Sequence, residues 1–173
     1  MQITYELTIK DWLEFQKNFY SKSKNYKKAK IVSIFAVPIL LLFFLAYDYL
    51  KNEVTYVNVV VFIIFSAIWI IFWPDRFDKI NLKYAKKMFN EGDNKAILGK
   101  RTIQFFDKYY LTKSASGESK IFWSYINNIE ETKDYLFIYT SSVSACIIPK
   151  KEINEKISEF IKSRNITNSI PVR

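Results

Sequence analysis

The side chains that most often carry out catalysis are scarce in this sequence of 173 residues. It contains no histidine, which removes the commonest general base and the commonest metal ligand. Cys146 is the only cysteine and lies in an apolar run, which favours a small buried residue over a reactive thiol. Glu130 and Glu131 are adjacent, so on a strand their carboxylates point to opposite faces. The serines of the segment 141–144 have no base beside them. We therefore expect no enzyme, cofactor or metal site.

Two apolar segments without charged residues dominate the first half of the chain, at 31–47 and 54–73. A helix rises about 1.5 Å per residue and the hydrocarbon core of a bilayer is about 30 Å thick. The second segment is long enough to cross, and the first crosses if it extends to Leu50. A buried hairpin of a soluble protein would need a large apolar partner, which the remaining chain is too small and too charged to supply. The sequence predicts transmembrane helices at 31–50 and 54–73.

Positive charge is distributed unevenly around these two segments. The net charge is +9, yet the connector 48–53 contains a single cation, Lys51. Loops rich in Lys and Arg remain on the cytoplasmic side of a membrane. The chain is therefore expected to cross the plasma membrane twice with both termini in the cytoplasm. No module that binds nucleic acid is recognisable, so the basic balance favours the lipid bilayer as partner.

The N-terminal segment 1–30 predicts a strand followed by an amphipathic helix. Residues 2–7 alternate polar and apolar, as in a short strand. Thr8 can then cap a helix, with Asp11 in the position of a capping-box acid. The apolar stripe of this helix could lie on the membrane surface or pack on the cytoplasmic domain, and we favour packing.

The C-terminal half predicts a small α+β domain. A juxtamembrane helix is expected at 74–92, after Pro74 ends or bends the second apolar helix. A cytoplasmic domain is expected at 93–165 and a tail at 166–173. Five alternating segments in this domain indicate antiparallel strands, and an amphipathic helix follows Pro149 to close the sheet. The expected strands are 96–106, 108–113, 119–130, 134–140 and 143–149.

Several short motifs in this order resemble the YcxB-like bacterial membrane proteins, whose C-terminal domain is grouped with bacterial pleckstrin-homology-like (PH-like) domains. The N-terminal motif is Ile-Thr-Tyr-Glu-Leu-Thr at 3–8. The others are Phe-Asp-Lys-Tyr-Tyr at 106–110, Ile-Phe-Trp-Ser-Tyr-Ile at 121–126 and Ile-Ile-Pro-Lys at 147–150. Lys108 departs from the glycine or small polar residue expected at the first turn. The resemblance implies a fold but no reaction.

Two groups of residues are candidates for function. Trp123, flanked by Phe122 and Tyr125, could line a pocket, although a place in the domain core is the better interpretation. Lysines beside the apolar segments could contact lipid headgroups, or could simply mark the topology, which alone accounts for them. These lysines are Lys22, Lys24, Lys27, Lys28, Lys30, Lys83, Lys86 and Lys87.

Three functions remain open on the sequence alone. The first is a membrane-anchored interaction module that binds a protein partner or assembles with itself through a sheet edge or the groove beside the final helix. The second is a module that binds or senses anionic lipid. The third is an immunity protein against a membrane-active peptide or toxin. Because a fold does not assign a function, the PH-like resemblance does not choose among them.

Overall fold

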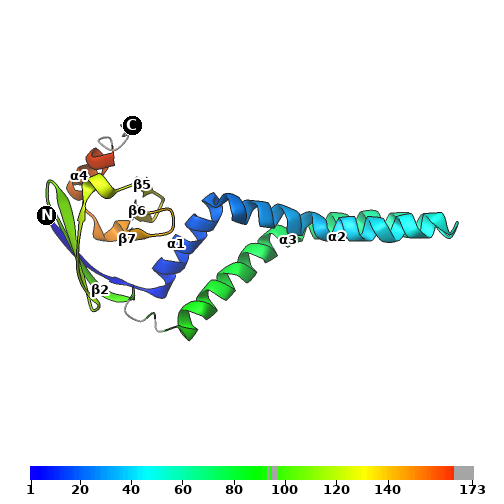
Figure 1. Ribbon diagram of the computed structural model, residues 1–173, viewed down its shortest axis with the longest axis horizontal. Coiled ribbons are helices and arrows are strands. Elements are labelled where there is room, and N and C mark those ends of the chain that lie inside the picture. The colour runs from blue at the N-terminus through cyan, green and yellow to red at the C-terminus, as the bar shows by residue number, and fades with distance from the viewer. Residues whose placement is uncertain (93, 95–96, 166–173) are drawn as a thin grey trace. The chain divides into compact units, whose positions relative to one another are not determined.

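The structure is a computed structural model that describes residues 1–92, 94 and 97–165. The chain forms two compact units, Met1–Gln16 with Lys86–Arg173 and Lys17–Ala85. The α+β fold class is confirmed, because an N-terminal strand, two long apolar helices, antiparallel strands and a closing helix follow one another (Figure 1). The tail expected at 166–173, like residues 93, 95 and 96, lies outside the described residues.

The first unit contains a four-stranded antiparallel sheet in the order β1-β2-β3-β4. Its strands are β1 (Gln2–Leu7), β2 (Gly99–Phe105), β3 (Tyr109–Ser114) and β4 (Gly117–Phe122). The predicted N-terminal strand is confirmed, and its alternating pattern buries Ile3, Tyr5 and Leu7 on one face. The turn between β2 and β3 closes with Lys108 in place, since the Phe106 amide donates to the Tyr109 carbonyl at 3.0 Å.

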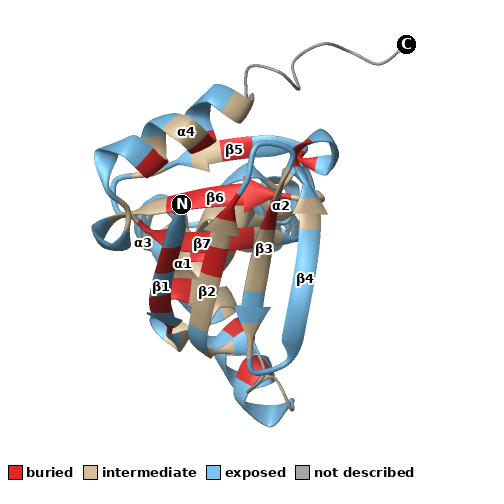
Figure 2. Cartoon of the chain, turned by 90° about the vertical axis from the view of Figure 1, so that its left-hand side faces the viewer, coloured by how far each residue is buried: buried red, intermediate tan, exposed pale blue. Residues whose placement is uncertain are grey.

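A second antiparallel sheet and a helix complete this unit. The sheet has the order β5-β6-β7, with β5 (Asn128–Glu131), β6 (Tyr135–Tyr139) and β7 (Ala145–Pro149). The closing helix α4 (Glu155–Asn165) lies against β5 (Figure 2) and buries Ile157 and Ile161. Four consecutive residues are buried in both β6 and β7, so these strands are covered on both faces.

The single strand expected at 119–130 is wrong, because the chain breaks at Trp123 and changes sheets. A short 3₁₀ turn, η2 (Trp123–Tyr125), separates β4 from β5. The indole of Trp123 donates to the carbonyl of Phe106 at 2.9 Å, and the ring packs 5.2 Å from that of Tyr110. Burying so large a ring inside the unit turns the backbone away from β4, an effect that alternation alone does not reveal.

The first unit, called the β unit from here on, is formed by Met1–Gln16 and Lys86–Arg173. It is larger than the expected domain 93–165, because β1 belongs to it. All six residues of β1 pair with β2, from Gln2 opposite Gln104 to Leu7 opposite Gly99. The N-terminal strand therefore joins a sheet whose other strands begin about ninety residues later. The two long apolar helices are an insertion between two adjacent strands of one sheet.

Helix α1 (Ile9–Lys22) begins with the predicted cap and packs on the β unit. The Asp11 carboxylate accepts hydrogen bonds from the Thr8 amide at 2.7 Å and from the Thr8 hydroxyl at 2.6 Å. It also accepts from the hydroxyl of Tyr135 at 2.8 Å, which ties the start of α1 to β6. Burial raises the pKa of Asp11, but these hydrogen bonds outweigh it and leave the pKa below its usual value.

The apolar face of α1 enters the core rather than remaining free for a membrane surface. Phe15 is 5% exposed, and its ring lies 5.8 Å from that of Phe137 and 6.0 Å from that of Tyr139. This part of α1 therefore packs on the β unit, as favoured from the sequence, and does not lie on a membrane surface.

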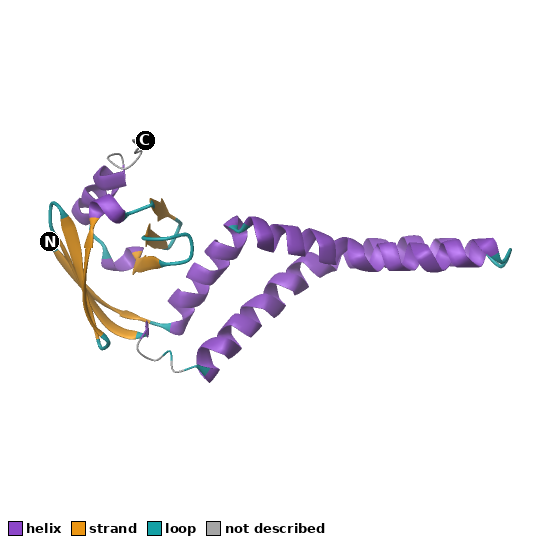
Figure 3. Ribbon diagram, in the orientation of Figure 1, coloured by secondary structure: helices purple, strands orange, loops and turns teal. Residues whose placement is uncertain are grey.

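The second unit contains the two apolar helices, α2 (Lys24–Leu50) and α3 (Tyr56–Glu91). Both are long and apolar enough to cross a membrane. The sequence left open whether Pro74 ends or bends the second helix, and α3 continues through it to Glu91, so residues 74–91 are not a separate helix. Proline removes one backbone hydrogen bond, whereas ending the helix there would leave about four carbonyls unpaired. Figure 3 shows α2 and α3 side by side over part of their length, and then diverging.

Candidate functional site

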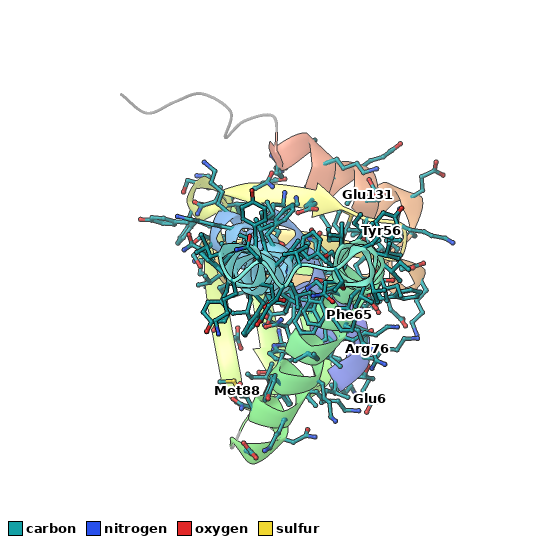
Figure 4. All side chains as sticks on the ribbon, turned by 90° about the vertical axis from the view of Figure 1, so that its right-hand side faces the viewer. Glu6, Tyr56, Phe65, Arg76, Met88 and Glu131 are labelled. Atoms are coloured by element: carbon teal, nitrogen blue, oxygen red, sulfur yellow. The ribbon has the colours of Figure 1, made fainter. Side chains whose placement is uncertain are left out.

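The surface of the two long helices is apolar and uncovered. No residue of α2 is buried, and side chains such as Phe43 and Ile71 are about 70% exposed. Figure 4, which views the hairpin from its connector, shows side chains projecting around both helices, among them Tyr56 and Phe65. A core helix of a soluble protein would be largely buried. Exposed apolar surface of this extent marks contact with lipid or with another apolar surface.

Two tryptophans of α3 bind α2 through their indole groups. Pro38 has no amide hydrogen, so the carbonyl of Ile34, four residues earlier, has no partner within its helix. The indole of Trp69 donates to that carbonyl at 3.1 Å. The indole of Trp73, stacked on Trp69, donates to the hydroxyl of Ser33 at 3.0 Å. In a solvent without hydrogen-bonding groups each such polar atom needs a partner, so these bonds fix the register of the hairpin.

Replacing Trp69 with phenylalanine should destabilise the hairpin by about 1 kcal/mol, because the Ile34 carbonyl loses its partner. The loss is measured as a lowered thermal midpoint of the full chain in detergent. The same change should cost less in a Pro38→Ala background, where the new amide hydrogen occupies that carbonyl. Equal losses in both backgrounds would contradict the assignment.

The basic end of the hairpin is held by an ion pair and a hydrogen bond. Asp78 of α3 accepts from the ammonium of Lys30 at 2.7 Å and from the hydroxyl of Tyr26 at 2.9 Å, one to each carboxylate oxygen. The Tyr26 ring lies 5.4 Å from that of Phe77. These contacts come immediately before the apolar part of α2 and shortly after that of α3. They close the hairpin where its surface changes from apolar to basic.

A cavity of about 350 Å³ opens beside this ion pair. Helix α1 ends at Lys22 and α2 begins at Lys24, with the hydroxyl of Ser23 accepting from the Tyr26 amide at 3.2 Å. The bend at Ser23 brings the ring of Tyr20 onto that of Tyr26, with centroids 4.5 Å apart. The cavity lies among α1, α2 and α3 and is lined by Lys17, Tyr20, Ser21, Tyr26, Lys27, Lys30, Asp78 and Leu82.

The lysines predicted to contact headgroups have different surroundings. Lys27 and Lys30 line the cavity, whereas Lys22, Lys24, Lys28 and Lys83 are exposed outside it in the same unit. Lys86 and Lys87 belong to the β unit, and Lys87 forms an exposed ion pair with Glu91 at 3.5 Å. Lys17 and Tyr20 were not among the predicted residues. Lys17 and Tyr20 are three residues apart, so they lie on the same face of a helix, and this spacing could have indicated that they belong to one site.

Phe122, Trp123 and Tyr125, which were predicted to share a core or pocket, lie in different surroundings. Trp123 is 6% exposed and belongs to the core, with its ring 6.1 Å from that of Phe160 on α4. Phe122 is 40% exposed and Tyr125 is 72% exposed, so both lie on the surface. The three side chains do not line one pocket.

The interior of the β unit contains polar groups with little reactivity. Burial raises the pKa of the Cys146 thiol to about 11, so it stays protonated at neutral pH and is a poor nucleophile. The hydroxyl of Tyr5 donates to the carbonyl of Ile147. The described residues contain no group of three acidic, cysteine or histidine side chains placed to hold a metal.

A second cavity, of about 310 Å³, lies at the start of α4, beside Leu136 and Ile153. Glu131 on β5 pairs with the ammonium groups of Lys150 at 2.5 Å and Lys162 at 2.6 Å, which hold the pKa of its carboxyl below the usual value. The pair with Lys162 links α4 to β5, whereas Lys150 precedes α4, and such exposed pairs contribute little energy. The edge of β5 is thus occupied by α4.

Comparison with known proteins supports one part of the sequence analysis. The search of curated proteins and the search of solved structures gave no match. Residues 105–163 match a family model described as YcxB-like protein. The match extends from the last residue of β2 into α4, and includes the three motifs predicted at 106–110, 121–126 and 147–150. The predicted resemblance is therefore confirmed over residues 105–163, which are similar to the YcxB-like proteins.

Proposed function

We propose that this chain is a two-pass plasma-membrane protein without enzymatic activity that displays a small interaction domain at the cytoplasmic face. The observation that carries the proposal is the insertion of an exposed apolar helical hairpin between β1 and β2 of one sheet. A hairpin placed there is joined to the β unit at two points of its chain, within α1 after Gln16 and within α3 before Lys86. The sequence resemblance supports a PH-like fold for the unit, as do its four- and three-stranded sheets closed by one helix.

The charge distribution supports cytoplasmic termini, because the connector has a single cation, Lys51. In a Cys146→Ser background, Glu53→Cys in the connector should react with a membrane-impermeant maleimide added to intact cells. Ser116→Cys, in the exposed turn between β3 and β4, should react only after the cells are opened. The protein should also remain in the membrane pellet after carbonate extraction. Reaction of Ser116→Cys in intact cells would refute the orientation, and release by carbonate would refute the membrane placement.

Strand β4 is the surface best suited to receive a partner. It is the last strand of its sheet, and most of its residues are exposed (Figure 2). The other edges are engaged: α4 lies along β5, and β1 contacts the 3₁₀ turn η3 (Lys150–Glu152) and, through the Tyr5 hydroxyl, the carbonyl of Ile147 on β7. An open edge presents unpaired amide and carbonyl groups to which an extended segment can add.

The charges of Glu118 and Lys120 on β4 disfavour non-specific pairing along this edge. We propose a strand of a partner protein, or β4 of a second copy, as the occupant.

Photo-crosslinking from β4 tests this proposal. A photoreactive residue at Ser119 should give one crosslinked product in intact membranes, either of twice the chain mass or with one defined partner. The same residue at Glu159, exposed on α4, is the matched control and should give little product. Equal products from the two positions, or none from Ser119, would count against strand addition at β4.

A further inference from the structure

We infer that the cavity among α1, α2 and α3 binds the phosphate group of an acidic phospholipid. The inference rests on the proposed membrane placement and adds a ligand to it. The cavity lies beside the Lys30–Asp78 pair, just before the apolar part of α2 and just after that of α3, and so at the depth of lipid headgroups if the hairpin spans a bilayer. A lipid there needs no path from the cytoplasm, because its headgroup is already at the opening.

The charges that line the cavity suit an anion. Lys17 of α1 and Lys27 and Lys30 of α2 contribute three ammonium groups, whereas Asp78 is the one carboxylate among the lining residues. Asp78 is neutralised at short range, because Lys30 and Tyr26 each bind one of its oxygens. The lining therefore keeps a net positive charge that attracts a phosphate diester.

The same arrangement favours an acidic headgroup over a zwitterionic one. A choline or ethanolamine headgroup brings its own cation, which needs an anionic neighbour. The only carboxylate of the lining already has two donors at 2.7 and 2.9 Å. An acidic lipid such as phosphatidylglycerol brings no such cation, and its phosphate can accept hydrogen bonds from lysine ammonium groups.

The remaining lining suits the apolar side of the same molecule. The stacked rings of Tyr20 and Tyr26 form one wall, and Leu82 of α3 adds an aliphatic side chain. Aromatic rings with polar tips are typical of the membrane interface, where they contact both the glycerol region and water. A free phosphate ion would gain nothing from these groups, so we commit to the lipid as ligand.

Native mass spectrometry of the full chain in neutral detergent micelles tests the site. Phosphatidylglycerol should bind about tenfold more tightly than phosphatidylcholine. The double variant Lys17→Gln, Lys27→Gln should weaken phosphatidylglycerol binding about tenfold or more, since each lysine near an anionic lipid adds to its attraction. The matched control Lys24→Gln, Lys28→Gln removes two neighbouring charges outside the cavity and should change binding less than about twofold. Lys17→Arg, Lys27→Arg should retain binding, which separates loss of charge from loss of folding.

Three results would overturn the site: equal losses from the two glutamine pairs, equal binding of the two lipids, or displacement of the lipid by millimolar inorganic phosphate. The first would mean diffuse attraction, and the last would mean a free phosphate as ligand. Each of them leaves the carbonate-extraction result unchanged. If instead the chain is released by carbonate, the proposed membrane placement fails independently of the lipid measurement.

Discussion

A chain that begins at Lys86 is expected not to fold, although it keeps six of the seven strands. It lacks β1, whose Ile3, Tyr5 and Leu7 are at most 7% exposed. Burying each such side chain contributes about 1.5–3 kcal/mol, and the three together approach the whole stability of a small domain, about 5–15 kcal/mol. Removal of β1 also leaves one edge of β2 without hydrogen-bond partners. Circular dichroism and the dispersion of amide resonances measure the outcome.

Restoring the N-terminal segment should restore the fold without the membrane helices. The rings of Trp12 on α1 and Phe89 on α3 lie 4.6 Å apart, so the cut ends of the β unit are close. A ten-residue Gly/Ser linker has a mean span of about 17 Å and can join Gln16 to Lys86. This linked domain should be soluble and should unfold cooperatively. A folded chain from Lys86 alone, or an unfolded linked domain, would contradict the role assigned to β1.

Replacing Trp123 with alanine should destabilise the linked domain by about 3–5 kcal/mol. The change empties the space that its ring occupies between Tyr110 and Phe160, and leaves the carbonyl of Phe106 without its indole donor. Trp123→Phe should cost less, because it keeps one aromatic ring in that space, although it loses the hydrogen bond and the volume of the second ring. Urea unfolding followed by circular dichroism gives each free energy.

Tyr125→Ala is the matched control, since this side chain is 72% exposed and only two residues away. It should change the free energy of unfolding by less than about 0.5 kcal/mol. A ligand-binding role for Trp123 predicts the reverse pattern, in which alanine at 123 leaves stability unaffected. That result would refute its assignment to the core.

Local patterns in the sequence were sufficient for several elements. The alternation of residues 2–7 predicted β1, and Thr8 with Asp11 predicted the start of α1. The length of the uncharged segments predicted α2 and the first part of α3. Each of these signals is contained in a short stretch of chain, so it can be recognised without knowing what that stretch contacts.

The features that were missed depend on distant contacts. The break at Trp123 reflects a hydrogen bond to Phe106 and packing against α4, neither of which leaves a mark on alternation. The place of β1 in the C-terminal sheet depends on pairing across about a hundred residues. The cavity likewise depends on Asp78 meeting Tyr26, which is 52 residues earlier in the chain. The charge pattern indicated the basic end of the hairpin, but not which lysines converge there.

The position of the hairpin between β1 and β2 has a consequence for biogenesis. During synthesis β1 leaves the ribosome first and must wait for β2 until both apolar helices have been made, so the sheet has a high contact order and forms late. If only one of the two helices crossed the bilayer, β1 and β2 would lie in different compartments and could not pair. β1 and β2 can therefore pair only if the chain between them crosses the bilayer an even number of times. A mis-inserted chain would expose β2 unpaired, and quality-control proteases could recognise that exposed edge.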